Sequence, residues 1–168
     1  MPAELVPIAP TNAMQFKAVR LAALQDSPTA FGSTYAKEAQ LSEADWLDRS
    51  KKWNGDKAIG YLAMDSRSPC GIVAAFIDEH APGKAHVVSM WVGPMHRRSG
   101  VGRSLIDAVV MWACAKSVSA LHLMVTSCND GAIEFYKRNG FAMTGKTEPY
   151  PNSPSLFEYE MSRPISKT

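Results

Sequence analysis

Three apolar runs of strand length stand close together in the middle of the chain, and they limit its fold more than any other feature. Each run is rich in valine, isoleucine or aromatic residues, and together they cover residues 58–64, 70–77 and 85–92. Residues that favour turns separate them, at 66–69 and 81–84. This pattern predicts an antiparallel β-meander.

Helical and strand-like patterns fill the rest of the chain. Apolar residues at helical spacing, a capping box at Ser42 and a glycine after Asn139 predict helices at 11–24, 42–53, 101–116 and 130–138. Short apolar runs predict further strands at 5–8, 120–126, 141–144 and 156–161. The predicted fold class is α/β of the α+β type, with a mixed, mostly antiparallel central sheet of about seven strands and flanking helices. A doubly wound sheet would alternate strand and helix from the start.

Composition and charge exclude several classes of protein. With 168 residues the chain is long enough to bury a core, and we expect one domain over 1–168. A net charge of +2 is too small for a nucleic-acid partner, which would require a clustered basic face. The longest candidate for a membrane helix, 105–115, is interrupted by Asp107, and the N-terminus does not resemble a signal peptide. We therefore expect neither a nucleic-acid nor a membrane partner.

The cysteines and histidines predict a reduced protein without a metal. The cysteines are an odd number without a Cys-x-x-Cys spacing, which fits a reducing compartment; they are Cys70, Cys114 and Cys128. The histidines show no recognised ligand spacing; they are His80, His86, His96 and His122. We therefore expect a cytoplasmic protein that holds no metal.

A charged, glycine-containing turn follows the meander, in the stretch HRRSGVGRSLID at 96–107. The first amides of a helix have no partners inside it, and the peptide dipoles leave partial positive charge there. In the turn 99–102, successive N–H groups can point at one centre, and the absence of Cβ atoms at Gly100 and Gly102 lets an anion come close. The neighbouring arginines add positive charge. The turn therefore predicts a phosphate or pyrophosphate site, with a plain structural turn as the alternative.

The common nucleotide motifs do not match this turn. A dinucleotide fingerprint requires a third glycine where Leu105 stands, and a P-loop requires a lysine that the turn lacks. Two segments instead resemble the GNAT superfamily of N-acetyltransferases. The family's pyrophosphate loop, Gln/Arg-x-x-Gly-x-Gly/Ala, is satisfied by residues 97–102, and its segment Asn-x-x-Ala-x-x-x-Tyr-x-x-x-Gly-Phe is matched by 129–141. The two motifs lie in register. Arg98 departs from the family, because many members have glycine there.

The resemblance implies an acetyl-CoA-dependent acyltransferase and assigns its binding residues. The strand 86–92 would separate from the strand 120–126, and the pantetheine of coenzyme A would pair with backbone groups in the gap, as an added strand does. The pyrophosphate would lie on the amides of the glycine turn. The resemblance thus implies contacts with coenzyme A at Met90, Trp91, Val92, Arg97, Arg98, Ser99, Gly100, Val101, Gly102, Arg103, Ser104, Asn129, Ala132 and Tyr136.

The resemblance also assigns Tyr136 as the general acid that protonates the departing thiolate. A tyrosine has an ordinary pKa of about 10 and still holds its proton at neutral pH. In a helix over 130–138, Tyr136 lies on the face of Ala132 and Ile133. Taken alone, Tyr136 also fits a half-buried aromatic residue, and Asn129 also fits a helix N-cap.

The base that deprotonates the acceptor amine is less well defined. His86 stands where some family members carry a catalytic glutamate, and its ordinary pKa is near neutrality. Glu79 is the rival candidate, both residues also fit a solvated hairpin, and a chain of water molecules is a third possibility. Cys128 precedes a predicted helix, which gives the hypothesis of a covalent acetyl-cysteine route. Direct transfer is the usual route of the family.

The expected acceptor is a primary amine of a small molecule or a protein. Its site is expected to lie between the helices 13–24 and 43–53, their connection and the loop 146–155. Aromatic residues there either line a pocket or only pack the helices; they are Phe31, Tyr35, Trp46, Trp53 and Tyr150. A cationic amine would suit the acidic residues Glu38, Glu43, Asp45 and Glu148.

Two further expectations concern partners and function. The resemblance implies a homodimer, with the late hairpin over 141–161 as a contact. A non-catalytic module that binds or senses acyl-CoA is the alternative to an enzyme. The presence of Tyr136 and Asn129 favours the enzyme.

Overall fold

The sheet contains all seven of the predicted strands. The computed structural model describes residues 3–166, so the predicted unit of 1–168 extends at both ends beyond the described residues. Within them the strand order is β1-β2-β3-β4-β5-β7-β6. Only β4 and β5 pair in parallel, which confirms a mixed, mostly antiparallel sheet. The strands are β1 (Glu4–Pro7), β2 (Ala58–Asp65), β3 (Ser68–Ile77), β4 (Lys84–Val92), β5 (Ala120–Thr126), β6 (Ala142–Pro149) and β7 (Phe157–Pro164).

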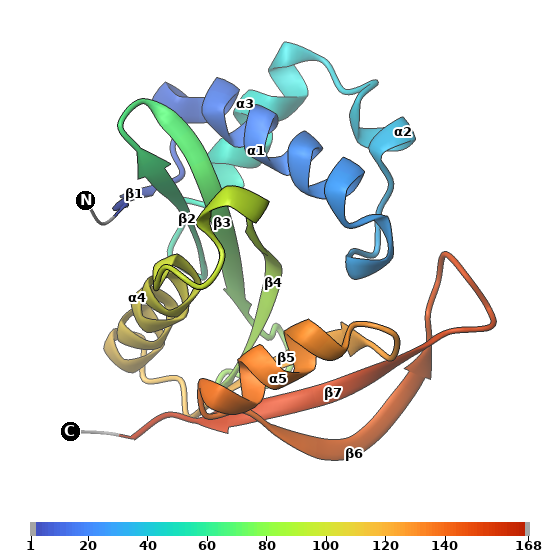
Figure 1. The fold of residues 1–168 in the computed structure, drawn as a ribbon. Helices are drawn as coiled ribbons and strands as arrows, with labels where there is room; N and C mark the ends of the chain where they lie inside the picture. The colour runs from blue at the N-terminus through green and yellow to red at the C-terminus, as the bar shows by residue number, and fades with distance from the viewer. Residues whose placement is uncertain (1–2, 167–168) are drawn as a thin grey trace.

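Helices cover both faces of this sheet. Figure 1 shows α1, α2 and α3 gathered on one side, whereas α4 and α5 lie on the other. The predicted capping box forms at the start of α3, where Ser42 and Asp45 each accept a hydrogen bond from the other's backbone amide. The helices are α1 (Ala13–Asp26), α2 (Tyr35–Glu38), α3 (Glu43–Lys52), α4 (Val101–Ala115) and α5 (Asp130–Arg138).

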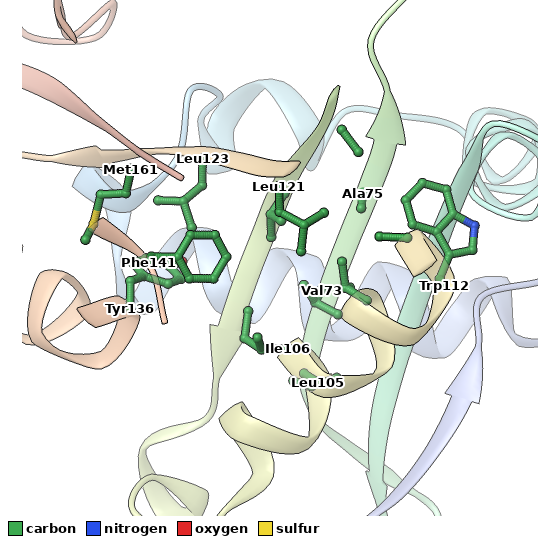
Figure 2. Packing of buried hydrophobic residues seen from close by; sticks show 14 of the residues in the cluster. Val73, Ala75, Leu105, Ile106, Trp112, Leu121, Leu123, Tyr136, Phe141 and Met161 are labelled. Carbon is green, nitrogen blue, oxygen red and sulfur yellow. The ribbon is translucent and has the colours of Figure 1, made fainter. Parts of the chain in front are cut away.

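Two hydrophobic clusters occupy the two faces of the sheet. The larger one joins α4 and α5 to the sheet, and Figure 2 shows Leu121 and Leu123 of β5 beside Ile106 of α4 and Phe141. The smaller one packs α1 and α3 on β2 and β3, with Trp46 fully buried and edge-on to Phe16. Each fully buried leucine or isoleucine contributes about 1.5–3 kcal/mol to folding. Because a shift of one residue would turn the apolar side chains of β5 to the other face, their alternation determines which face of the strand packs against the helices.

Two elements differ from the sequence-based prediction. β6 extends to Pro149 rather than to Thr144, and it carries an irregularity in its pairing with β7 between Met143 and Thr147. All of its side chains are exposed, so it has no apolar alternation from which its length could be predicted. The short α2 was not predicted; Thr34 caps it by accepting a hydrogen bond from the Lys37 amide.

Candidate functional site

The parallel strands β4 and β5 are paired over a short distance only. Their partners are Lys84 with Ala120, Ala85 with Leu121, and His86 with His122. Beyond His86, β4 remains paired with β3, and β5 with β7, but β4 and β5 separate from each other. The separation that the resemblance implied is therefore present.

The last residue of β4 turns its backbone groups toward this split. The Gly93 amide donates to the Cys70 carbonyl of β3 at 2.7 Å. Because backbone groups of successive strand residues point to opposite neighbours, those of Val92 face the β5 side, where the Val92 carbonyl accepts a hydrogen bond from Arg97. The Trp91 side chain lies on the α1 face of the sheet, whereas Met90 and Val92 pack with the α4 cluster.

A β-bulge bends β4 at the same place. Ile72 pairs with Trp91 and Ala74 pairs with Val88, so Ser89 and Met90 together oppose Val73 alone. Ser89 has a φ of 59°, in the left-handed region. A bulge leaves one residue outside the hydrogen-bonded ladder and increases the local twist. The bulge therefore directs β4 away from β5.

The glycine turn opens helix α4. Gly100 is the N-cap residue with a φ of 89°, and a Cβ at this position would have no heavy atom within 4 Å. Arg98 also has a positive φ, of 60°. The common glycine of the family at this position is consistent with that backbone, because left-handed conformations are least costly for glycine. The Ser99 hydroxyl donates to the His96 carbonyl within the turn.

The two glycines have different roles in this structure. The predicted open approach for an anion exists at Gly100, but it does not exist at Gly102. A Cβ on Gly102 would lie 2.9 Å from Cε1 and 3.0 Å from Cζ of Phe135 in α5. Gly102 is therefore needed for the close packing of α4 against α5, and the expectation that its missing Cβ serves the anion is corrected.

The arginines of the turn differ in what they contact. Arg97 donates through Nε to the Val92 carbonyl at 2.9 Å and through Nη2 to Asp26 at 2.6 Å. Arg103 lies on the exposed side of α4, with Nε 3.9 Å from Asp107. Arg98 and Ser104 are exposed, and Val101 is buried in the core. The side chains of Arg98 and Ser104 are therefore free to meet a ligand without rearrangement. Arg97 is exposed too, but its two hydrogen bonds hold it in place.

Asp26, at the end of α1, joins that helix to this turn. It accepts hydrogen bonds from the Trp91 indole at 3.0 Å and from Arg97. The Trp91 bond is the largest of the effects that lower the pKa of Asp26, and the bonds from Ser27 and Arg97 act in the same direction against the desolvation. This contact could not be predicted from the sequence, where Asp26 has the pattern of a residue that ends a helix.

Helix α5 carries Tyr136 into the larger hydrophobic cluster, beside Phe141. The side chain is buried, with Phe135 and Phe141 edge-on at centroid distances of 5.4 and 5.7 Å. Its hydroxyl forms no side-chain hydrogen bond with any residue in 3–166, and burial raises its pKa far above the ordinary value. Asn129 caps α5 by accepting from the Ala132 amide at 3.2 Å, so its N-cap role is present.

His86 lies at the paired end of β4, on the face opposite Tyr136. Its Nε2 is 2.7 Å from Oδ2 of Asp78, and its ring packs against Phe76. The bond from His86 lowers the pKa of Asp78 to about 2, with the backbone amide of His80 as the next contribution. The structure does not bring His86 and Tyr136 together on one side of the sheet. Glu79 is exposed.

His122 of β5 lies beside His86, at the end of the split where β4 and β5 are still paired. It pairs with His86 in the strand register, and its Nδ1 lies 3.6 Å from Oε2 of Glu160 on β7. Burial and the nearby Lys84 lower the pKa of His122. His122 was not predicted as a site residue, because a lone histidine in a strand carries no functional signal.

The aromatic residues considered for an acceptor pocket mainly pack the helices. Trp46 and Phe31 are buried in two different clusters, and Trp53 stacks near Phe76. Tyr150 is buried and donates its hydroxyl hydrogen to the Phe31 carbonyl. Tyr35 is exposed. These side chains do not converge, so packing explains them.

The acidic residues considered for a cationic acceptor are largely occupied. Glu38 is buried between Arg20 and Arg49, each 2.9 Å from one of its oxygens, which corrects its proposed availability. Asp45 belongs to the capping box, and Glu148 pairs with Lys146 at 3.2 Å. Glu43 is exposed in the first turn of α3.

Other predicted features are placed as follows. Cys128 is exposed directly before α5, with Sγ 3.9 Å from the Thr29 hydroxyl, and the acetyl-cysteine route stays a hypothesis. Within residues 3–166, histidine, cysteine and acidic side chains form no group of three or more suited to a metal ion. Among the helices of the described chain, none is both long and apolar enough to cross a membrane.

Comparison with known proteins identifies the family. A sequence model described as "Acetyltransferase (GNAT) family" matches residues 21–141. The chain is 29% identical over 115 residues to the streptothricin acetyltransferase of Escherichia coli, covering 58% of this chain and 66% of that protein. The chain therefore belongs to the GNAT acetyltransferase family.

Solved structures agree with this assignment at the level of the fold. A GNAT acetyltransferase from Streptococcus pneumoniae superimposes with a TM-score of 0.81 at 21% identity, covering 97% of this chain and 99% of that one. The PaiA N-acetyltransferase from Thermoplasma acidophilum, solved in complex with coenzyme A, gives a TM-score of 0.77 at 15% identity, covering 98% and 99%. The matched part of this chain spans about two thirds or less of the curated relatives' own length.

Proposed function

We propose that this protein is an N-acetyltransferase that moves the acetyl group of acetyl-CoA to a primary amine by direct transfer in a ternary complex. The observation that carries the proposal is the split between β4 and β5, with the glycine turn following the separated end of β4. Members of the family have been solved with coenzyme A or acetyl-CoA. The buried Tyr136 of α5 supports the proposal as the candidate acid.

The residues present fit coenzyme A. Gly100 leaves open space in front of the first amides of α4, where helix dipole and unpaired N–H groups favour a pyrophosphate. We propose that the backbone groups of Met90 and Val92 pair with the amides of the pantetheine. Arg97 now donates to the Val92 carbonyl, so it must share that oxygen or move when the pantetheine pairs there.

The transfer forms one N–C bond and breaks one C–S bond, and two protons must move. The acceptor amine loses a proton, for which we propose His86, held by Asp78, acting through water. The departing thiolate gains a proton from Tyr136. Burial keeps Tyr136 protonated at neutral pH, and its hydroxyl has no competing side-chain partner among the described residues. For the negative charge that develops on the carbonyl oxygen, we propose a backbone amide of the bulge at Ser89 and Met90 as the hydrogen-bond donor.

The acceptor belongs to the amines, and a small molecule such as streptothricin is our first candidate because a relative is named for it. Cytoplasmic location and a homodimer through the late hairpin stay part of the proposal. The exposed β6 is the sheet edge that such a contact would use. A non-catalytic acyl-CoA sensor is the second candidate, and it would bind acetyl-CoA without turnover.

Calorimetric titration with acetyl-CoA tests the proposal. Gly100→Asp should weaken binding at least tenfold more than Gly100→Asn, because the two side chains have nearly the same shape and only aspartate is charged. The electrostatic repulsion between this carboxylate and the pyrophosphate is about 1–4 kcal/mol. Asp and Asn both tolerate a left-handed backbone, so both variants should fold.

Turnover separates the two candidate functions. Release of free thiol from acetyl-CoA should require an amine from a panel of streptothricin, polyamines, amino acids and peptides with free N-termini. Binding without any thiol release would favour the sensor. A folded wild-type protein that does not bind acetyl-CoA would refute both.

A further inference from the structure

The bulge in β4 contains an energetically costly residue. Ser89 has a φ of 59°, and residues with a Cβ pay roughly 1–2 kcal/mol in the left-handed region. Such a conformation persists only where the surroundings impose it. Ser89 is also the point at which β4 bends after its last pairing with β5 at His86.

One side chain from another element reaches this bulge. Nη1 of Arg20, in the middle of α1, donates to the Ser89 hydroxyl oxygen at 3.3 Å. No other side chain in residues 3–166 forms a hydrogen bond with Ser89. The contact joins α1 to the edge of β4 where the split begins.

Arg20 is itself fixed by a buried carboxylate. Its Nε and Nη2 donate to the two oxygens of Glu38 at 3.0 and 2.9 Å, and its guanidinium lies 5.0 Å over the Phe31 ring. Burial alone would raise the pKa of Glu38, but Arg20, with Ser33 and Arg49, lowers it overall. The two-point contact with an ionised carboxylate fixes the plane of the guanidinium and so aims its third nitrogen at Ser89.

Arg49 provides an internal comparison. Its Nη1 donates at 2.9 Å to the Glu38 oxygen that Arg20 Nε also contacts, but Arg49 lies in α3 and forms no hydrogen bond with β4 within the described residues. Both arginines therefore support the helices, whereas only Arg20 also contacts the bulge. Arg20 is also the more buried of the two, with 12% of its side chain exposed against 39% for Arg49, so a general loss of stability must be measured separately from the loss of the Ser89 contact.

We propose that Arg20, aimed by Glu38, is a positioning residue that holds the Ser89 bulge and thereby keeps the β4 edge in the shape that binds acetyl-CoA. This inference rests on the proposed function, because it concerns the same split. Arg20 acts through Ser89 and does not itself touch the ligand.

Matched substitutions test the inference. Arg20→Lys and Arg49→Lys keep the positive charge beside Glu38, but a lysine ammonium cannot hold Glu38 at two points and reach Ser89 as well. Arg20→Lys should raise the Kd for acetyl-CoA roughly fivefold to tenfold, the equivalent of one ordinary hydrogen bond. Arg49→Lys should leave this Kd within about twofold. Thermal unfolding of both variants controls for their effect on stability.

Ser89→Ala removes the hydroxyl while keeping a Cβ in the left-handed backbone. It should raise the Kd to the same extent as Arg20→Lys, and the double variant should be no weaker than either single one, because both remove the same contact. Equal Kd values for Arg20→Lys and Arg49→Lys, or a wild-type Kd for Ser89→Ala, would overturn the inference.

Amide hydrogen exchange separates this inference from the proposed function. In the protein without ligand, residues 87–91 should exchange at least several-fold faster in Arg20→Lys than in Arg49→Lys. Equal exchange overturns the inference even if acetyl-CoA binds. If exchange is faster but the protein does not bind acetyl-CoA, the proposed function is refuted, and so is the part of the inference that concerns ligand binding. Only the conclusion that Arg20 holds the bulge would then remain.

Discussion

Gly102→Ala should destabilise the protein through one contact between α4 and α5. The added Cβ would lie 2.9 Å from Phe135, about half an ångström closer than an ordinary contact, so the ring or the helix must move. Strain of this kind costs about 1–3 kcal/mol. For a chain of this length, each kcal/mol lowers the Tm by roughly 2–4 °C.

Gly131→Ala is the matched control for this prediction. Gly131 is the second residue of α5, as Gly102 is the second residue of α4, and a Cβ on Gly131 would have no heavy atom within 4 Å. Both variants therefore share the gain in helix propensity, of up to about 1 kcal/mol. Urea unfolding at pH 7 should give Gly102→Ala a stability about 1–3 kcal/mol below that of Gly131→Ala.

The same measurement contains the result that would refute the reasoning. If the two alanine variants are equally stable, the contact with Phe135 does not explain Gly102. Phe135→Leu shortens the side chain that meets the new Cβ. Combined with Gly102→Ala, it should show a favourable coupling of about 0.5 kcal/mol or more in a double-mutant cycle. Additive losses would place the strain elsewhere.

Three further predictions follow from buried polar groups. Glu38→Gln should cost about 3 kcal/mol in urea unfolding at pH 7, because it leaves Arg20 without its carboxylate. Since the folded pKa of Glu38 is lowered, its contribution is present above the ordinary value of 4.5 and is lost as the pH falls through the folded pKa, so the difference from wild type should narrow in acid. Tyr136→Phe should keep the wild-type Tm, because the hydroxyl has no side-chain partner among residues 3–166, and should slow acetyl transfer about 10²-fold or more in the thiol-release assay; an unchanged rate would remove Tyr136 as the acid. Because the pKa of His122 is lowered below 6.5, the free energy of unfolding of the wild type should fall as the pH drops from 7 to 5. In chemical denaturation, His122→Gln should show a smaller fall over this range. Parallel curves of unfolding free energy against pH for the two proteins would contradict this prediction.

Much of the fold could be predicted from local pattern. The meander β2–β4 and the strand β5 are buried on at least one face, so their apolar residues mark their ends to within a few residues. Helix α4 follows a glycine turn whose backbone only certain residues adopt easily. By contrast, β6 is exposed along its whole length, and no burial pattern marks where it ends.

The candidate site was predictable only where it depends on backbone geometry. The glycine turn and the segment of Asn129 and Tyr136 carry motifs, because a left-handed cap and a helix face require particular residues at fixed spacing. The contacts of Asp26 with Arg97, and of Arg20 with Ser89, join residues about 70 positions apart. Charged residues on an amphipathic helix give no sign of such partners, which depend on how the helices lie on the sheet.

The short junction between β4 and β5 also bears on how the chain folds. The meander β2–β4 and the hairpin of β6 and β7 are antiparallel and closed by short connections, so each can form from contacts that are local in sequence. The parallel junction holds at three residue pairs and can form only after α4 has crossed from one part to the other. We therefore expect two folding units that dock late, with this junction as the first part of the sheet to open when the folded protein fluctuates.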